Sequence, residues 1–150
     1  MFASAEFLWR VNQEYVNRLT RARNYLDLLE QLMVERGSED MRHRFLPTLR
    51  FTRLHLASLS EEHRDWCYTY FYESPDSKRM VHAPSAVRRA LSNFQLMRER
   101  QANAFEDVAA LLYELPRPAS YITHVPNGDL WEMLQRSLRD LVRFNSLAEV

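Results

Sequence analysis

His63 and Cys67 are the two residues whose types and spacing come nearest to a catalytic pair in this chain. Residues four apart lie one turn apart on a helix, where an imidazole could activate a thiolate as a nucleophile. Cys67 falls within a segment rich in aromatic residues, however, and free cysteine is among the most buried residue types. We therefore expect Cys67 to pack in a core, and an enzyme acting through this pair is the more distant hypothesis.

Other kinds of chemistry find little support in the sequence. A carboxylate-bridged di-iron bundle needs Glu-x-x-His on two helices, and the chain contains no such motif. Asp40 and His43 have a similar spacing once, beside Arg42 and Arg44, which repel a cation. Two glycines cannot build a glycine-rich phosphate loop. We expect no catalytic residue, no metal and no cofactor, and hence a protein that is not an enzyme.

Residues 85–115 form the most regular segment of the chain. Apolar residues recur there in steps of three and four, with one step of seven that passes over Gln101, which is typical of a helix with one apolar stripe. These residues are Val87, Ala90, Phe94, Met97, Ala104, Val108, Leu111 and Leu115. Gln101 could hydrogen-bond across a bundle, but we favour the interpretation that it turns towards solvent.

Residues 4–36 show the same spacing and predict a second long helix. Its stripe consists of Leu8, Val11, Tyr15, Leu19, Ala22, Leu26, Leu29 and Met33. Gly37 is expected to end this helix, and Ser38 is expected to cap the next. Two long helices with apolar stripes favour antiparallel packing, so we predict that 4–36 and 85–115 form the antiparallel spine of a bundle.

The middle of the chain is less regular. Pro47 is expected to interrupt or kink a helix, and Ser58 with Glu61 resembles a capping box that opens another. We favour a helix for residues 61–73, although alternating aromatic residues leave a small hairpin over residues 51–72 as an alternative. The prediction is an all-α bundle of about five helices.

Length and composition place these helices in a single domain, residues 1–150. A lone cysteine excludes an internal disulfide and indicates a reducing, intracellular compartment. No apolar run approaches the roughly 20 residues of a spanning helix, so we expect no transmembrane segment. The N-terminus does not resemble a secretory signal.

The positive charges are unevenly placed, although the 20 basic and 20 acidic residues balance. Segments 41–60 and 77–98 contain no acidic residue, so together they could form one basic face for RNA or DNA. The predicted contacts are Arg42, Arg44, Arg50, Arg53, Arg88 and Arg89. The alternative is that folding interleaves these segments with acids such as Glu35, Glu61, Glu62 and Glu106.

Segment 116–128 reads as an irregular arm with three prolines. Ordered loops of this length are uncommon without a function, so its apolar residues Tyr121, Ile122 and Val125 are predicted to contact a partner. Tyrosine, tryptophan and arginine are also favoured at interfaces. The leading hypothesis is therefore a non-catalytic subunit or adaptor of a larger protein assembly, with a nucleic-acid-binding module as the alternative.

One short stretch has a likeness to a known family. Leu8, Trp9 and Arg10, near the start of the first helix, resemble the Leu-Tyr-Arg signature of the mitochondrial LYR family. The stretch departs from that pattern at Trp9, and Glu14 stands where the family commonly has a basic residue. The resemblance implies a small helical accessory subunit or assembly factor of a mitochondrial complex.

Overall fold

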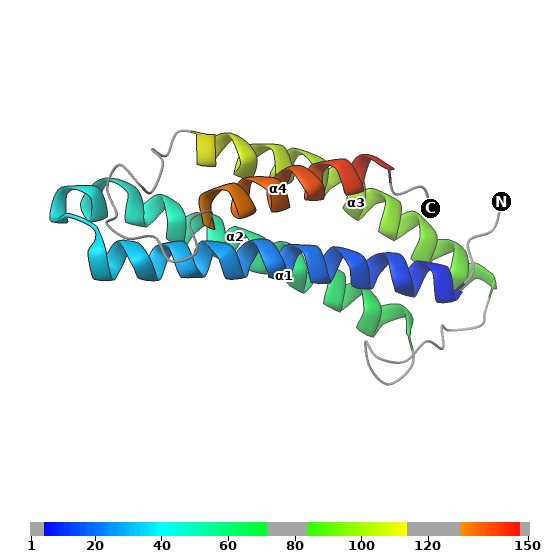
Figure 1. Cartoon of the computed structure of the whole chain (residues 1–150). Coiled ribbons are helices and arrows are strands. Elements are labelled where there is room, and N and C mark those ends of the chain that lie inside the picture. The colour runs from blue at the N-terminus through cyan, green and yellow to red at the C-terminus, as the bar shows by residue number, and fades with distance from the viewer. Residues whose placement is uncertain (1–4, 72–83, 114–129, 148–150) are drawn as a thin grey trace.

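Four α-helices make up the part of the chain that the computed structural model describes, which is residues 5–71, 84–113 and 130–147. They are α1 (Ala5–Arg36), α2 (Glu39–Tyr70), α3 (Pro84–Tyr113) and α4 (Leu130–Leu147). Each helix runs opposite to the one before it along an elongated bundle (Figure 1). The predicted all-α class is confirmed, and the described residues form four helices where about five were predicted for the chain.

The expected interruption at Pro47 does not occur. α2 has 32 residues, and Pro47 lies inside it. A proline in a helix interior costs about 3 kcal/mol, since it removes a backbone hydrogen bond. The ring of Pro47 lies on the exposed side of α2, while Leu46 and Leu49 are buried on the other side. Packing of that buried side keeps the helix continuous.

The second expected boundary in this region is also absent. Ser58 and Glu61 lie inside α2 and do not open a new helix, since the buried stripe continues past them from Leu56 through Leu59 to His63. The hairpin alternative for residues 51–72 is wrong, because residues 51–70 are helical. The helix predicted from residue 61 is confirmed as far as Tyr70.

A tight connection joins α1 to α2, as the sequence predicts. The Gly37 N–H donates to Met33 O at 2.9 Å, and a Cβ on Gly37 would lie only 2.5 Å from that oxygen. Ser38 then caps α2, with its Oγ accepting from the Met41 N–H at 3.2 Å. Such a short connection makes α1 and α2 antiparallel neighbours.

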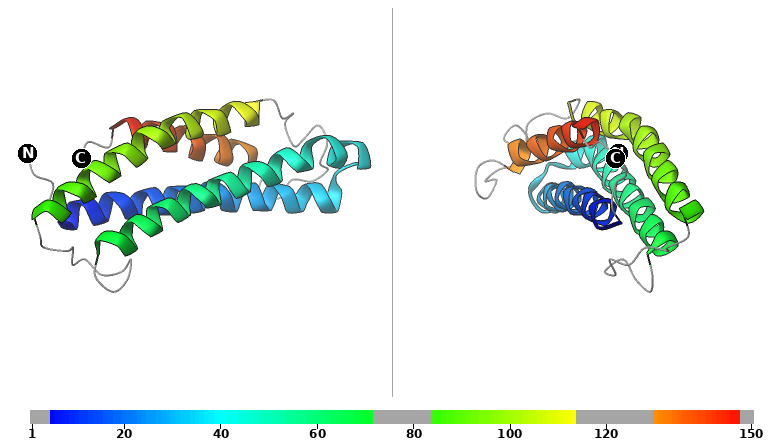
Figure 2. Two further views of the ribbon diagram at one scale, coloured as in Figure 1. Left: turned by 180° about the vertical axis from the view of Figure 1, so that it is seen from behind. Right: turned by 90° about the vertical axis from the view of Figure 1, so that its right-hand side faces the viewer.

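The predicted antiparallel spine of α1 and α3 is wrong. The end-on view shows that neighbours in sequence are neighbours in space, and α4 closes the bundle against α1 (Figure 2). α1 and α3 therefore lie diagonally and run in the same direction (Figure 1). They meet across the core where the rings of Tyr15 and Phe94 pack edge to face, 5.9 Å apart. The short connection after Arg36 gives α1 a different antiparallel partner, α2.

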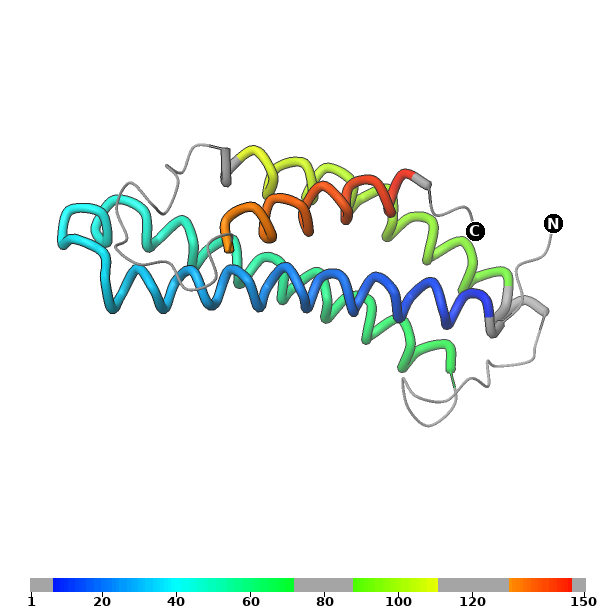
Figure 3. The backbone as a smooth tube through the Cα atoms, in the orientation of Figure 1, coloured from blue at the N-terminus to red at the C-terminus, as the bar shows by residue number. Residues whose placement is uncertain are grey.

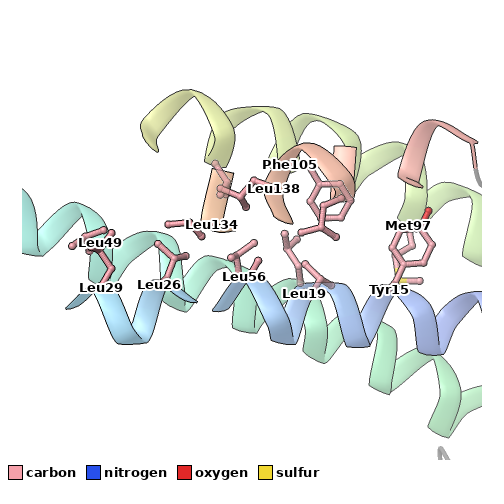
Figure 4. Close-up of a cluster of buried hydrophobic side chains, with 14 of the residues drawn as sticks. Tyr15, Leu19, Leu26, Leu29, Leu49, Leu56, Met97, Phe105, Leu134 and Leu138 are labelled. Atoms are coloured by element: carbon pink, nitrogen blue, oxygen red, sulfur yellow. The ribbon is translucent and has the colours of Figure 1, made fainter. Parts of the chain in front are cut away.

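The core runs along the bundle and changes character on the way. One half is lined by leucines from α1, α2 and α4, of which Figure 4 labels Leu26, Leu29, Leu49 and Leu134. The other half begins near Tyr15 and contains most of the buried polar side chains. α4 has 18 residues against 30 or more in the others, so it covers only the middle of α1 (Figure 3).

Candidate functional site

His63 and Cys67 are both fully buried, one turn apart on the inner face of α2. Asn12 of α1 lies between them and contacts both. Its Nδ2 donates to the Cys67 sulfur at 2.9 Å and to the His63 backbone oxygen at 3.1 Å. Its Oδ1 lies 2.8 Å from His63 Nδ1. His63 and Cys67 are therefore both in contact with a third polar residue, Asn12, from another helix.

Gln101 of α3 reaches the opposite side of the His63 ring. Its Oε1 lies 2.7 Å from His63 Nε2, and its Nε2 donates to Glu62 Oε2 at 2.9 Å and to Leu59 O at 3.4 Å. The interpretation that Gln101 turns towards solvent is wrong, because only 1% of it is exposed. The amide stays inside because every one of its polar groups finds a partner there.

Tyr15 extends these contacts to α4. Its ring stacks on His63 with 4.6 Å between centroids, and its hydroxyl donates to Asn145 Oδ1 at 2.8 Å. Arg98 of α3 donates from Nε to Asn145 O at 2.7 Å, near the C-terminus of α4 where a cation is favourable. We call Asn12, Tyr15, His63, Cys67, Gln101 and Asn145 the polar network. It ties all four helices together.

Sequence reasoning missed Asn12 and Asn145 as members of the polar network, although a signal was present. Asn12 follows Leu8 by four residues and precedes Tyr15 by three, so it occupies a stripe position. Asn145 follows Leu141 by four residues in the same way. A polar residue that keeps the apolar spacing indicates a buried hydrogen bond to another helix. Tyr15 was assigned to the core, but its hydroxyl partner on α4 is not encoded locally.

Burial sets the protonation of the polar network. Desolvation lowers the pKa of His63 to about 4, outweighing the Gln101 hydrogen bond and the Glu62 charge, which raise it. Desolvation also raises the pKa of Cys67 to about 11, against the hydrogen bond from Asn12, and that of Tyr15 to about 12, against the charge of Arg98. All three groups are neutral at pH 7. A thiolate–imidazolium pair therefore has no stabilisation at this site.

A neutral imidazole carries one N–H, so it cannot donate to two oxygens at once. Gln101 Nε2 is held by Glu62 and Leu59 O, which keeps its oxygen towards His63 Nε2 and favours the tautomer protonated there. The contact between His63 Nδ1 and Asn12 Oδ1 then lacks a proton. This unsatisfied contact is the consequence of keeping His63 neutral in the core.

The described residues offer no other obvious chemical centre. Within residues 5–71, 84–113 and 130–147, no three His, Cys, Asp or Glu side chains gather as metal ligands. Asp40, whose spacing to His43 suggested a ligand pair, lies 3.6 Å from Arg44. That ion pair occupies one of the few carboxylates in this region.

Four of the six predicted nucleic-acid contacts lie on α2 and have partners within the chain. Arg50 and Arg53 both donate to Glu30 of α1, at 2.9 and 2.8 Å, and they lower its pKa against the effect of its burial. Arg42 donates to Val34 O at 2.9 Å. The interleaving alternative therefore holds for this segment, with Glu30 and Asp40 in place of the acids expected.

Arg88 and Arg89 are exposed at the start of α3, at the opposite end of the bundle from the start of α2 (Figure 1). The described parts of segments 41–60 and 77–98 therefore do not lie side by side as a single basic face. Tyr121, Ile122 and Val125, the predicted partner contacts, lie outside the described residues.

The tryptophans do not form the interface surface that their number suggested. Trp66 and Trp131 are buried, and Trp66 Nε1 donates to Ala90 O at 3.0 Å, which fixes α2 against α3. Only Trp9 is partly exposed. The large apolar side chains that do reach the surface are mostly aliphatic, together with Phe7, Phe51 and Tyr68.

Two of these side chains flank a hollow between α1 and α4. Leu28 of α1 and Met133 of α4 are 48% and 43% exposed, and the hollow between them has a volume of about 290 Å³. We call this hollow the α1–α4 groove; its other lining residues are Tyr25, Gln31, Leu32, Glu35 and Leu130.

No helix in the described part of the chain is both long and apolar enough to cross a membrane. No family model, curated protein or solved structure matches the chain. The likeness to the LYR signature therefore stays confined to Leu8, Trp9 and Arg10.

Proposed function

We propose that this protein is a non-catalytic helical subunit or adaptor that binds a protein partner through the α1–α4 groove. The observation that carries the proposal is the exposure of Leu28 and Met133 on either side of an apolar hollow. Apolar side chains from two elements that converge on one concavity are typical of a binding surface. The groups that could do chemistry are, by contrast, neutral and buried in the core.

The groove fits an amphipathic helix of the partner better than a polar ligand. A helix in a groove buries residues spaced three and four apart, which matches a hollow that runs between two antiparallel helices. The exposed carboxylate of Glu35 lies at the rim beside Gln31. We therefore expect the partner helix to place a lysine or arginine next to its apolar face.

Two further hypotheses remain as predictions. The arm 116–128, with Tyr121, Ile122 and Val125, is a second predicted contact, and its deletion tests it separately from the groove. Nucleic-acid binding gains less support, because Arg50 and Arg53 already form ion pairs with Glu30 and Asp27. If it occurs, it weakens steeply as salt is raised.

The proposal is tested by isolating the native complex under mild conditions, identifying the bound protein and rebuilding the complex from purified components. Leu28→Glu is expected to weaken binding at least tenfold, because it places a charge in the groove. Leu96→Glu is the matched control, since Leu96 is similarly exposed but lies on α3. Both variants should keep the helical circular dichroism of the parent.

The two groups of outcomes are distinct. Loss of binding in Leu28→Glu together with normal binding in Leu96→Glu supports the groove. Equal binding by all three proteins contradicts it. Glu35→Lys should weaken binding several-fold through repulsion of the basic residue, and a reversed charge on the partner should restore it.

A further inference from the structure

The outward face of α2 carries a second regular stripe, separate from the one that faces the core. Six residues recur on it in alternating steps of three and four, and all six are exposed. We call them the α2 outer seam: Arg44, Pro47, Phe51, Leu54, Ser58 and Glu61. A spacing of 3.5 residues places side chains along a straight line that a second helix can cover.

The centre of the α2 outer seam is apolar. Phe51 is 63% exposed and Leu54 is 59% exposed, among the highest values for large apolar side chains in the described residues. Among the described residues, the ring of Phe51 stacks on that of His55, with 6.1 Å between centroids, on the same helix. No other described helix covers this face. Phe51 and Leu54 are therefore exposed to water, while the opposite face of α2 packs in the core.

The order of charges along the α2 outer seam identifies what can cover it. Arg44 lies seven residues before Phe51, and Glu61 lies seven residues after Leu54. When two such helices pack antiparallel, Phe51 of each faces Leu54 of the other, and Arg44 of each faces Glu61 of the other. A parallel pairing would place Arg44 against Arg44 and Glu61 against Glu61, which is repulsive. The seam is therefore complementary to itself in one direction only.

We propose that the α2 outer seam is a self-association surface on which two copies of this chain pack antiparallel about a two-fold axis between residues 52 and 53. Self-complementary contacts of this kind produce closed dimers. The seam is about 26 Å long from Arg44 to Glu61 at 1.5 Å per residue. The apolar pairs lie beside the axis, and the ion pairs lie at both ends.

The present partners of the two charged residues do not oppose this pairing. Arg44 lies 3.6 Å from Asp40, and Glu61 lies 3.1 Å from Arg64, both within α2. These four side chains are largely exposed, so their ion pairs contribute little and can be exchanged.

Sedimentation equilibrium of the full chain over a range of concentrations tests the proposal. The parent chain is expected to shift from monomer to dimer as concentration rises, and Phe51→Glu should raise the dimer dissociation constant at least tenfold. Leu96→Glu, which places the same charge on α3, should leave the constant unchanged. A parent chain that stays monomeric at every concentration, or a dimer unaffected by Phe51→Glu, overturns the proposal.

Charge reversal tests the direction of packing. Arg44→Glu and Glu61→Arg should each weaken the dimer, because each creates like-charge pairs at both ends. The double variant Arg44→Glu/Glu61→Arg should restore the parent dissociation constant. Failure of the double variant to recover association overturns the antiparallel arrangement. Because Leu28→Glu is expected to leave the dimer intact, failure of this proposal is distinguishable from failure of the α1–α4 groove.

Discussion

The two halves of the core hold the four helices together by different kinds of contact. In the half around Leu26, Leu29 and Leu49, leucines from facing helices exclude water without directional contacts. In the other half, Asn12, Gln101 and Asn145 connect helices through hydrogen bonds that need one particular alignment. Apolar burial is tolerant of small shifts, whereas a buried hydrogen bond is lost by them.

We therefore expect the stability of the fold and the alignment of its helices to depend on different residues. Burial of a leucine side chain stabilises the fold by roughly 1.5 to 3 kcal/mol, whichever neighbour provides the contact. A buried hydrogen bond adds only about 1 kcal/mol, but leaving its partner unsatisfied costs about 1 to 3 kcal/mol. The apolar half should therefore set how stable the bundle is, and the polar network should set which helix alignment it adopts.

The largest expected effect is in the apolar half. Leu49→Ala removes a fully buried side chain of α2 and should lower the free energy of unfolding by about 3 to 4 kcal/mol, since lost burial and a cavity add together. Leu54→Ala is the control on the exposed face of the same helix, with an expected change below about 0.5 kcal/mol. Urea denaturation measures both, at a concentration where Leu54 is not engaged in a dimer. Similar losses in the two variants would contradict the assignment of the core.

The next effect is a pH dependence that belongs to the polar half. The pKa of His63 is about 4 in the folded protein against 6.5 when unfolded, so the unfolded chain binds more protons between these values. Stability is therefore complete above pH 6.5 and falls on acidification, by about 3 kcal/mol when pH 4 is reached. Urea denaturation at closely spaced pH values measures the decline.

Two controls isolate His63 in that experiment. His63→Gln should remove most of the decline between pH 6.5 and 4.5, whereas His55→Gln, at a partly exposed position on α2, should retain it. Glu30 and Glu62 have lowered pKa values, so their contributions are lost only below the ordinary glutamate value of 4.5. Stability that rises on acidification from pH 6.5 would mean that His63 is protonated in the core.

The same contrast explains which features the sequence could predict. Apolar spacing predicts the long helices, and the Gly37–Ser38 connection follows from local chemistry. Local signals failed at Pro47 and at Ser58, where burial on the inner face of α2 outweighs a weak propensity to break the helix. The prediction for the orientation of Gln101 was wrong for a different reason, because its partners His63 and Glu62 lie on another helix.

The smallest expected change in stability comes from replacing the centre of the polar network as a unit. Asn12→Ala alone removes the donor to the Cys67 sulfur and to the His63 backbone oxygen, and should cost about 2 kcal/mol. The triple variant Asn12→Leu/His63→Leu/Gln101→Leu removes these polar groups together, and its stability should stay within about 1 kcal/mol of the parent, since buried polar groups are often replaceable by apolar ones.

The alignment of α1 and α3 along α2, in contrast, should become less well defined in the triple variant. Without the contacts of Asn12 and Gln101 to His63, apolar packing and the hydrogen bond from Trp66 to Ala90 O are left to define how far α1 and α3 slide along α2. We expect broadened or doubled amide NMR signals near residues 12, 63 and 101, while signals near Leu49 keep a single set. A triple variant with sharp single signals throughout would show that the alignment does not depend on the contacts of Asn12, His63 and Gln101, and the two halves of the core would then differ in chemistry but not in role.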